Sequence, residues 1–322
     1  MKAAKHTIYG GPEVVTVTDI PKPQPQKNEI IIRVIASTVN RTDDGLRSAS
    51  YFISRFFTGL FKPKQQVLGS EFSGIVEQVG EGVSKWKSGD HVFGFNDTRM
   101  GAHAEFMVLH DDDAIALKPE NLSFQQAASL SEGGHYALAD IYAAKVKSGD
   151  EVLVYGATGA IGTAAVQLLK YMGVKVTAVV DSNRVELAHS LGADVVIDYE
   201  KTDYSELPHR FDLVFDSVGK SSFSVARKVL KPSGIYVSTE LGKRGDNVWR
   251  GLISRFQSGQ RVLFPIPLTR LEDIQLLGKL AADGKYTPVI DRVYRLDDIV
   301  EAHRYVGSGQ KTGNVIIEIG SV

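Results

Sequence analysis

Residues 151–172 of the chain read Glu-Val-Leu-Val-Tyr-Gly-Ala-Thr-Gly-Ala-Ile-Gly-Thr-Ala-Ala-Val-Gln-Leu-Leu-Lys-Tyr-Met. A short apolar run typical of a buried strand leads into small residues, and apolar residues at the spacing of one helical face follow. The small residues form the pattern Ala157-x-Gly159-x-x-Gly162, the dinucleotide-binding fingerprint with alanine in the first glycine position. Such a turn brings backbone N–H groups and the positive end of a helix close to a pyrophosphate.

We therefore expect a bound dinucleotide at this turn. The alternative is a glycine-rich loop that only packs the helix on the sheet, but the strand before the turn and the helix and strand after it favour binding. The residues expected to contact the cofactor here are Gly156, Thr158, Gly159, Ala160 and Ile161.

The residues around the turn predict the fold class. From about residue 121, apolar strand runs alternate with helical periods, which indicates βαβ units and a doubly wound parallel sheet, the Rossmann form of an α/β fold. Residues 1–120 instead read as short strands and turns of a barrel-like β unit. After about residue 268, one helix and one strand do not extend the alternation, so we expect them to complete the first domain. The expected domains are 1–120, 121–267 and 268–322.

Composition excludes several function classes. The chain has 322 residues, with 37 Lys and Arg against 38 Asp and Glu, and it has no cysteine. The balanced charge gives no general attraction to nucleic acid or to an anionic membrane. The lack of cysteine removes disulfides, thiolate zinc sites and iron–sulfur clusters. Without an apolar run of ~20 residues or a signal peptide, the sequence predicts a cytoplasmic protein with no nucleic-acid or membrane partner.

The end of the second expected strand bears on the choice of cofactor. Asp181 follows Gly162 by 19 positions, close to the spacing of the acid that binds the ribose hydroxyls of NAD. Ser182 and Arg184 come directly afterwards, and an Arg with a hydroxyl group is the usual partner of the 2′-phosphate of NADP. Arg184 could equally be a solvated residue at the start of the next helix. The residues alone leave both cofactors open.

Motifs along the rest of the chain carry a family resemblance. They are Ala36–Asp43, Leu68–Val76, Gly89–Gly94, the glycine turn, Ser190–Asp194 with Val196–Tyr199, and Gly309–Val315. In their order and spacing, the chain resembles the zinc-free quinone oxidoreductase branch of the medium-chain dehydrogenase/reductase superfamily. This resemblance implies a GroES-like β domain, built from both chain ends, that flanks a six-stranded Rossmann domain. It also implies a homodimer.

The resemblance allows zinc to be considered residue by residue. Zinc-dependent members have a cysteine at the position of Asn40, a histidine at that of Ser70, and a four-cysteine loop for a second zinc. Asparagine and serine are poor zinc ligands, and the chain has no cysteine for the loop. His103 and His110 are better explained as packing or surface residues. We expect no metal.

Hydride transfer without a metal needs alignment of the reactants and stabilisation of negative charge on the acceptor oxygen. The resemblance places nicotinamide-side polar groups after the strand 30–36, so we expect Asn40 to orient the nicotinamide or the acceptor and Thr42 to donate its hydroxyl. Both residues could instead cap a helix. Tyr51, in an aromatic-rich stretch, is a third candidate donor, although packing would also explain it.

The resemblance also implies further cofactor contacts. They are Tyr199 at the adenosine phosphate end, Val218 after the fourth strand, Phe264 and Ile266 beside the carboxamide, and Lys311 and Asn314 in the closing C-terminal segment.

Together these observations predict a zinc-independent reductase that uses NADPH, with NADH also possible, to reduce quinones or α,β-unsaturated carbonyl compounds. Two alternatives remain open. One is an alcohol or aldehyde oxidoreductase, although an unactivated carbonyl gains more from a Lewis acid. The other is a nucleotide-binding protein with a regulatory role, because a fold does not determine a function.

Overall fold

The computed structural model describes residues 1–49, 55–208, 210–254 and 258–321. The chain forms two compact units, Met1–Glu132 with Thr269–Val322, and Gly133–Leu268. The first observed boundary lies after the expected position at residue 120. The reason is helix α3 (Phe124–Ala128), which packs on strands of the first unit and accepts a 2.6 Å hydrogen bond at its Phe124 carbonyl from Ser73.

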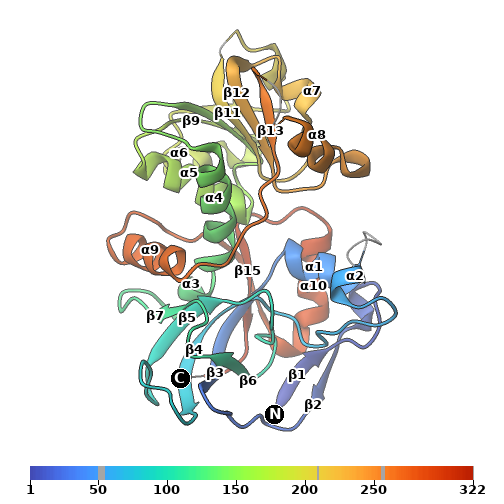
Figure 1. The fold of residues 1–322 in the computed structure, drawn as a ribbon, viewed down its shortest axis with the longest axis vertical. Coiled ribbons are helices and arrows are strands. Elements are labelled where there is room, and N and C mark those ends of the chain that lie inside the picture. The colour runs from blue at the N-terminus through green and yellow to red at the C-terminus, as the bar shows by residue number, and fades with distance from the viewer. Residues whose placement is uncertain (50–54, 209, 255–257, 322) are drawn as a thin grey trace. The chain divides into compact units, whose positions relative to one another are not determined.

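The first unit is built on a seven-stranded sheet in the order β14–β15–β3–β4–β5–β7, with β6 paired to β3 (Figure 1). Strand β3 (Glu29–Val39) is rich in isoleucine and valine, which favour strands, and it pairs antiparallel with β4, β6 and β15. The last strand of the chain, β15, therefore lies beside β3, a strand from the N-terminal part. The other strands are β1 (Lys2–Lys5), β2 (Thr16–Asp19), β4 (Glu71–Val79), β5 (His91–Phe95), β6 (Phe106–His110), β7 (Ile115–Leu117), β14 (Ile290–Arg295) and β15 (Asn314–Glu318).

Helix α1 (Arg41–Ser48) starts where β3 ends. Asn40 takes the N-cap position with an extended backbone, and the Asp43 carboxylate accepts the Asn40 N–H at 2.9 Å. This turn brings Asn40 and Thr42 to the end of the strand. The remaining helices of the unit are α2 (Arg55–Thr58), α9 (Leu271–Ala282) and α10 (Ile299–Gly307), with short 3₁₀ helices η1 (Pro12–Val14) and η6 (Leu296–Asp298).

The second unit holds a six-stranded parallel sheet in the order β10–β9–β8–β11–β12–β13 (Figure 1). In chain order this is 3-2-1-4-5-6, the Rossmann arrangement, whose strand order reverses between β8 and β11. Ligands bind at the carboxyl ends of the strands at such a reversal. The strands are β8 (Glu151–Tyr155), β9 (Lys175–Val180), β10 (Val195–Asp198), β11 (Phe211–Asp216), β12 (Leu230–Ser238) and β13 (Arg261–Leu263).

The parallel sheet is buried on both faces, as its apolar runs predicted. Successive side chains of a strand point to opposite faces of the sheet. Because Val152, Leu153 and Val154 of β8 all have no exposed surface, both faces are covered. Its helices are α4 (Ser131–Ala144), which begins just before the unit boundary, α5 (Ala160–Tyr171), α6 (Val185–Ser190), α7 (Phe223–Ala226) and α8 (Asp246–Ser254), with the 3₁₀ helices η3 (Ser182–Arg184), η4 (Tyr204–Glu206) and η5 (Lys243–Gly245).

The predicted fold class is confirmed. The apolar runs that alternate with helical periods from about residue 121 form the six strands of the parallel sheet. The sequence patterns did not predict β1, β2, β7 or β14, which are short or carry polar residues at most positions. Within the described part of the chain, no helix is both long and apolar enough to cross a bilayer.

Replacing Gly162 by alanine tests how closely the backbone approaches itself at the glycine turn. A Cβ at this position would lie 2.2 Å from the Gly156 carbonyl oxygen and 2.8 Å from Ala157 Cα. We expect Gly162→Ala to lower the free energy of unfolding by about 1–3 kcal/mol in urea titrations, because backbone atoms must move. Gly45→Ala is the control, since its Cβ would meet nothing within 4 Å and alanine favours a helix. Equal stability of the two variants would show that the turn has room for a side chain at Gly162.

Candidate functional site

The glycine turn after β8 forms a cradle of bare backbone. Gly156 adopts a φ of +75°, and a Cβ there would lie 2.6 Å from Val218 Cγ1. Gly159 is the N-cap of α5, whose first-turn N–H groups have no partner within the helix. Side chains would fill this space, so the local geometry fits a pyrophosphate held by backbone amides.

Strand β11 supports this cradle from the other side of the strand-order reversal. Ser217, the first residue after β11, donates its hydroxyl to the carbonyl oxygens of Tyr155 and Gly156, both at 2.9 Å. Val218 follows and borders Gly156. The structure thus brings Val218, Gly156 and Thr158 together at the carboxyl ends of the strands, where a dinucleotide is expected.

The residues expected at the adenosine end of the cofactor lie after β9 and β10. Asp181 forms an ion pair with Arg184 and accepts the Asn183 N–H at 3.1 Å. The acid that would favour NAD and the guanidinium that would favour NADP are therefore partners in the same structure. Their charges offset each other at the position where the sequence predicts contact with the ribose.

The other residues of this end form a second polar group. Ser182 donates its hydroxyl to Asp198 at 2.6 Å, and Lys201 lies 2.7 Å from the same carboxyl group. These hydrogen bonds lower the pKa of Asp198, first that from Lys201 and then that from Ser182. Tyr199 lies between Asp198 and Lys201 in the sequence. It is 49% exposed, so its ring is available to a ligand. Two further predicted contacts follow β13: Phe264 is half-buried and Ile266 is exposed.

In the first unit, Asn40 lies at the centre of a buried polar cluster. Its Oδ1 accepts a hydrogen bond from Lys311 Nζ at 3.2 Å. Because an ammonium group can only donate, this contact determines which end of the amide is oxygen. The amide nitrogen then faces the carboxyl groups: it donates to Glu71 Oε1 at 2.9 Å and lies 3.4 Å from Glu132 Oε2.

Glu71, on β4, accepts four hydrogen bonds and has no exposed surface. Oε2 accepts the backbone N–H groups of Ser131 at 3.1 Å and Glu132 at 2.8 Å. Oε1 accepts the Thr38 hydroxyl at 2.7 Å and the Asn40 amide. All its lone-pair sites are therefore occupied.

Glu132, near the start of α4, is held mainly by hydroxyl groups. Thr42 donates to Oε1 at 2.7 Å and Ser70 donates to Oε2 at 2.9 Å. Burial, followed by repulsion from Asp43, raises the pKa of Glu132 to about 7. Burial also raises the pKa of Asp43, to about 6, against the effect of the N–H groups that it accepts from Asn40 and Gly69.

Lys311 supplies the cation of this cluster. Burial lowers its pKa to about 8, although Glu132 and Glu71 oppose that change. The pKa values of Glu132 and Lys311 are thus both displaced toward neutrality, a pattern typical of acid–base groups at active sites.

The structure distributes the predicted residues unevenly. Asn40, Thr42 and Lys311 come together in this cluster, while Asn314 is buried and donates to the Val289 carbonyl at 3.1 Å. Asn40 is only 2% exposed and all its polar atoms bind protein groups, which favours positioning of its neighbours over contact with a ligand. Tyr51 lies outside the described residues.

Sequence reasoning missed the three carboxylates Asp43, Glu71 and Glu132. Asp43 and Glu71 lie within the motifs that carry the family resemblance, and each follows a strand or begins one near Asn40. A signal was present, because acidic residues inside otherwise apolar or small-residue stretches are buried only when they are paired. Glu132 carries the same signal, since it precedes two glycines at the start of a mostly apolar helix.

A zinc ion does not fit the residues around Asn40. The Lys311 ammonium binds Asn40 Oδ1 and would repel a second cation there, and the neighbouring carboxyl groups of Glu71 and Glu132 already accept hydrogen bonds from protein groups on both oxygens. Among the described residues, the only three His, Asp or Glu side chains whose ligand atoms all lie within 4.8 Å are His110, at the end of β6, and Asp111 and Asp112, in the turn that follows. Such surface acidic groups are common without a metal.

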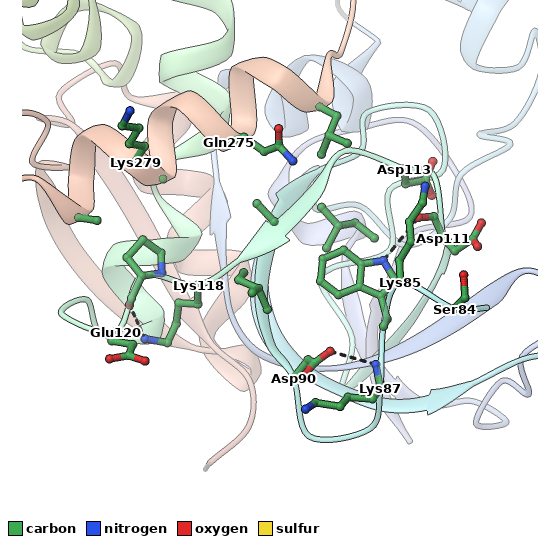
Figure 2. Close-up of a pocket in the computed structure, with 18 residues that line it drawn as sticks. Ser84, Lys85, Lys87, Asp90, Asp111, Asp113, Lys118, Glu120, Gln275 and Lys279 are labelled. Carbon is green, nitrogen blue, oxygen red and sulfur yellow. Dashed lines mark hydrogen bonds between the residues drawn. The ribbon is translucent and has the colours of Figure 1, made fainter.

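A cavity of about 1070 Å³ in the first unit lies apart from these residues, and none of the predicted site residues lines it (Figure 2). Charged groups of both signs surround it, including Lys85, Asp90 and Asp113. Several are already engaged: Asp90 accepts the Lys87 N–H at 2.9 Å, and Lys118 donates to the Pro119 carbonyl at 2.9 Å. It lacks the convergent polar groups of the Asn40 cluster.

Comparisons with known proteins agree with this arrangement. The sequence matches the alcohol dehydrogenase GroES-like domain over residues 26–120 and the zinc-binding dehydrogenase family over residues 191–317. It is 31% identical to the 2-methylene-furan-3-one reductase of Solanum lycopersicum and 28% identical to the chloroplastic NADPH-dependent alkenal/one oxidoreductase of Arabidopsis thaliana, in both cases over 98% of this chain and 79% of the other protein.

The structure is similar to that of the quinone oxidoreductase from Coxiella burnetii, with a TM-score of 0.87, 29% sequence identity and coverage of 99% of both chains. The β unit built from both chain ends and the six-stranded Rossmann unit are the two parts that such proteins share. The chain belongs to the medium-chain dehydrogenase/reductase superfamily of oxidoreductases, in its quinone oxidoreductase-like branch.

Proposed function

We propose that this protein is a zinc-independent reductase that uses NADPH to reduce quinones or α,β-unsaturated carbonyl compounds. The observation that carries the proposal is the Lys311–Asn40–Glu71/Glu132 cluster. It offers hydroxyl and carboxyl protons and an ammonium group where zinc-dependent relatives have metal ligands. The compounds named for the relatives share one feature, a carbonyl oxygen conjugated to a carbon that can accept hydride.

The bound cofactor supplies hydride to the acceptor carbon. The protein's own task is then to place the acceptor, to exclude water and to stabilise the negative charge that develops on the acceptor oxygen. Thr42 is suited to this task, because its hydroxyl is half-buried at the start of α1 and is already ordered by Glu132 at 2.7 Å. A conjugated acceptor spreads its charge and needs no Lewis acid, which agrees with the residues around Asn40.

NADPH is the favoured cofactor because of the groups after β9. Arg184 brings a guanidinium, Ser182 a hydroxyl and Lys201 an ammonium to the expected ribose end. Asp181 is the opposing feature, but its charge is offset by Arg184. NADH remains a possible second cofactor, since Asp181 could bind ribose hydroxyls once it separates from Arg184.

Steady-state assays test the proposed activity. We expect oxidation of NADPH in the presence of cyclohexenone or benzoquinone, with no loss of rate after dialysis against a chelator. The physical reason is that no step of the proposed chemistry needs a metal. A protein that turns over neither acceptor, with NADPH or NADH, would refute the proposal. Activity that chelation removes and added zinc restores would instead favour an alcohol or aldehyde oxidoreductase.

Replacing Arg184 tests the choice of cofactor. Arg184→Ala should weaken NADPH binding by about 1–3 kcal/mol, the scale of a hydrogen bond to a charged group, and leave NADH binding nearly unchanged. Asp181→Asn is the matched variant. The Asp181 carboxylate has the same charge sign as the 2′-phosphate of NADPH, so its removal should favour NADPH over NADH. Calorimetric titration of each variant with both cofactors measures the two effects. An equal loss for both cofactors in Arg184→Ala would show that Arg184 does not bind the 2′-phosphate.

A further inference from the structure

The charges of the Asn40 cluster do not balance when every group is ionised. Asp43, Glu71 and Glu132 would carry three negative charges and Lys311 one positive charge, and none of the three carboxyl groups is more than 4% exposed. Removing this excess of like charge from water is costly, and protonation of one carboxyl group relieves it. The cluster therefore holds a proton at neutral pH.

Hydrogen-bond donors show that Asp43 does not hold this proton. Its two oxygens accept the backbone N–H groups of Asn40 at 2.9 Å and Gly69 at 3.0 Å. It also lies in the first turn of α1, where the helix dipole favours a negative charge. Backbone N–H groups can only donate, so they stabilise the ionised form.

Glu71 is also surrounded by groups that favour ionisation. Three of its four donors are amide N–H groups, those of Ser131, Glu132 and the Asn40 side chain, and none of these nitrogens can accept a carboxylic proton. Burial, then repulsion from Glu132, raises the pKa of Glu71, whereas the backbone N–H of Glu132 and the Thr38 hydroxyl lower it. The two glutamates thus compete for one proton, and the donors around Glu71 oppose its protonation.

Glu71 has one hydroxyl partner, Thr38, on an oxygen that it shares with the Asn40 amide, whereas both oxygens of Glu132 meet a hydroxyl group. Thr42 and Ser70 approach its two oxygens with hydroxyl groups at 2.7 and 2.9 Å, and a hydroxyl oxygen accepts as readily as it donates. We propose that Glu132 carries the proton of the cluster and delivers it, through Thr42, to the oxygen of the reduced acceptor. This inference rests on the proposed function, and it assigns Glu132 as a positioning residue that acts through Thr42.

The proton movement follows from the direction of the hydrogen bonds. When Glu132 is protonated it donates to Thr42 Oγ1, which frees the Thr42 hydrogen to point at a bound acceptor oxygen. Hydride adds to the acceptor carbon, the carbonyl electrons move to the oxygen as an enolate, and that oxygen takes the Thr42 proton. Thr42 takes the proton of Glu132, the resulting enol rearranges to the saturated ketone in water, and Glu132 regains its proton from solvent water.

The charged groups around Glu132 predict a pH dependence. Asp43 on α1 and Glu71 on β4 face it and favour the protonated form, whereas Lys311, just before β15, favours the ionised form. Asp291 and Arg41 act on Lys311 from further away. Because the protonated form is the active one, the rate should fall as the pH rises through about 7.

Glu132→Gln is the central test, since an amide keeps the size of the side chain and its hydrogen bonds but cannot release a proton. With NADPH and cyclohexenone, we expect kcat to fall by about 100-fold, at the lower end of general acid catalysis, and the decline of rate above pH 7 to disappear. The Kd for NADPH and the Tm should change little. A variant that keeps the wild-type kcat and the same decline with pH would overturn the inference.

Three further variants separate proton delivery from structural effects. Thr42→Val removes the hydroxyl link and should reproduce the loss seen in Glu132→Gln, whereas Thr42→Ser should recover most of the lost rate relative to Thr42→Val. Asp140→Asn is the matched control, because Asp140 is a buried carboxyl group on the same helix, eight residues beyond Glu132. We expect its kcat and pH profile to match the wild type. Equal losses in Thr42→Val and Thr42→Ser would overturn the role of the hydroxyl.

Infrared spectroscopy tests the position of the proton without any turnover. The difference between wild type and Glu132→Gln should contain a protonated carboxyl band at pH 6 that disappears as the pH rises past 7. No such band would overturn the assignment of the proton to Glu132. Wild-type protein that reduces neither acceptor would refute the proposed function, and with it the delivery step, whatever the infrared result. Wild-type turnover with an unaltered Glu132→Gln would overturn only the inference about Glu132.

Discussion

The first unit depends on one constraint, the burial of three carboxyl groups beside a single ammonium. Asn40 mediates between them, with its oxygen toward Lys311 and its nitrogen toward Glu71 and Glu132. Such a group of buried charges is tolerated only if every lone pair and proton has a partner, and breaking one partner would leave a costly unpaired charge. The same constraint underlies the chemistry that we propose, because it raises the pKa of Glu132 and lowers that of Lys311 toward neutrality.

The second unit depends on a different constraint, the close approach of backbone at the end of β8. Gly162 and Gly156 leave room that a Cβ would fill, and Ser217 ties the end of β11 to the same turn. The turn thus exposes helix N–H groups at the point where the strand order reverses. The features that we propose to be functional are therefore of two kinds: backbone N–H donors suited to an anion in one unit, and buried carboxyl groups that we infer to hold a proton in the other.

The sequence allowed more of the fold than of the site to be predicted. Continuous apolar runs that alternate with helical patterns indicated the strands of the parallel sheet, and the strand–turn–helix around Gly159 identified the Rossmann unit. The boundary at residue 120 was placed too early, because α3 packs on strands far from it in sequence. Asn40, Thr42 and Lys311 were named separately, and their hydrogen-bonded connection through Glu132 and Glu71 was not anticipated, since it joins residues up to 271 positions apart.

What the sequence by itself determined is local: apolar periodicity, the glycine pattern and the absence of zinc-type ligands at Asn40 and Ser70 are properties of short segments. Only the tertiary structure decided which acid is paired, which amide faces which carboxyl group and where a proton can rest. The physical reason is that periodicity and turn chemistry act over a few residues, whereas burial and hydrogen-bond satisfaction depend on what β3, β4, α4 and the segment before β15 bring to one place. Glu71 and Glu132 are both buried glutamates, and only their different donors distinguish their roles.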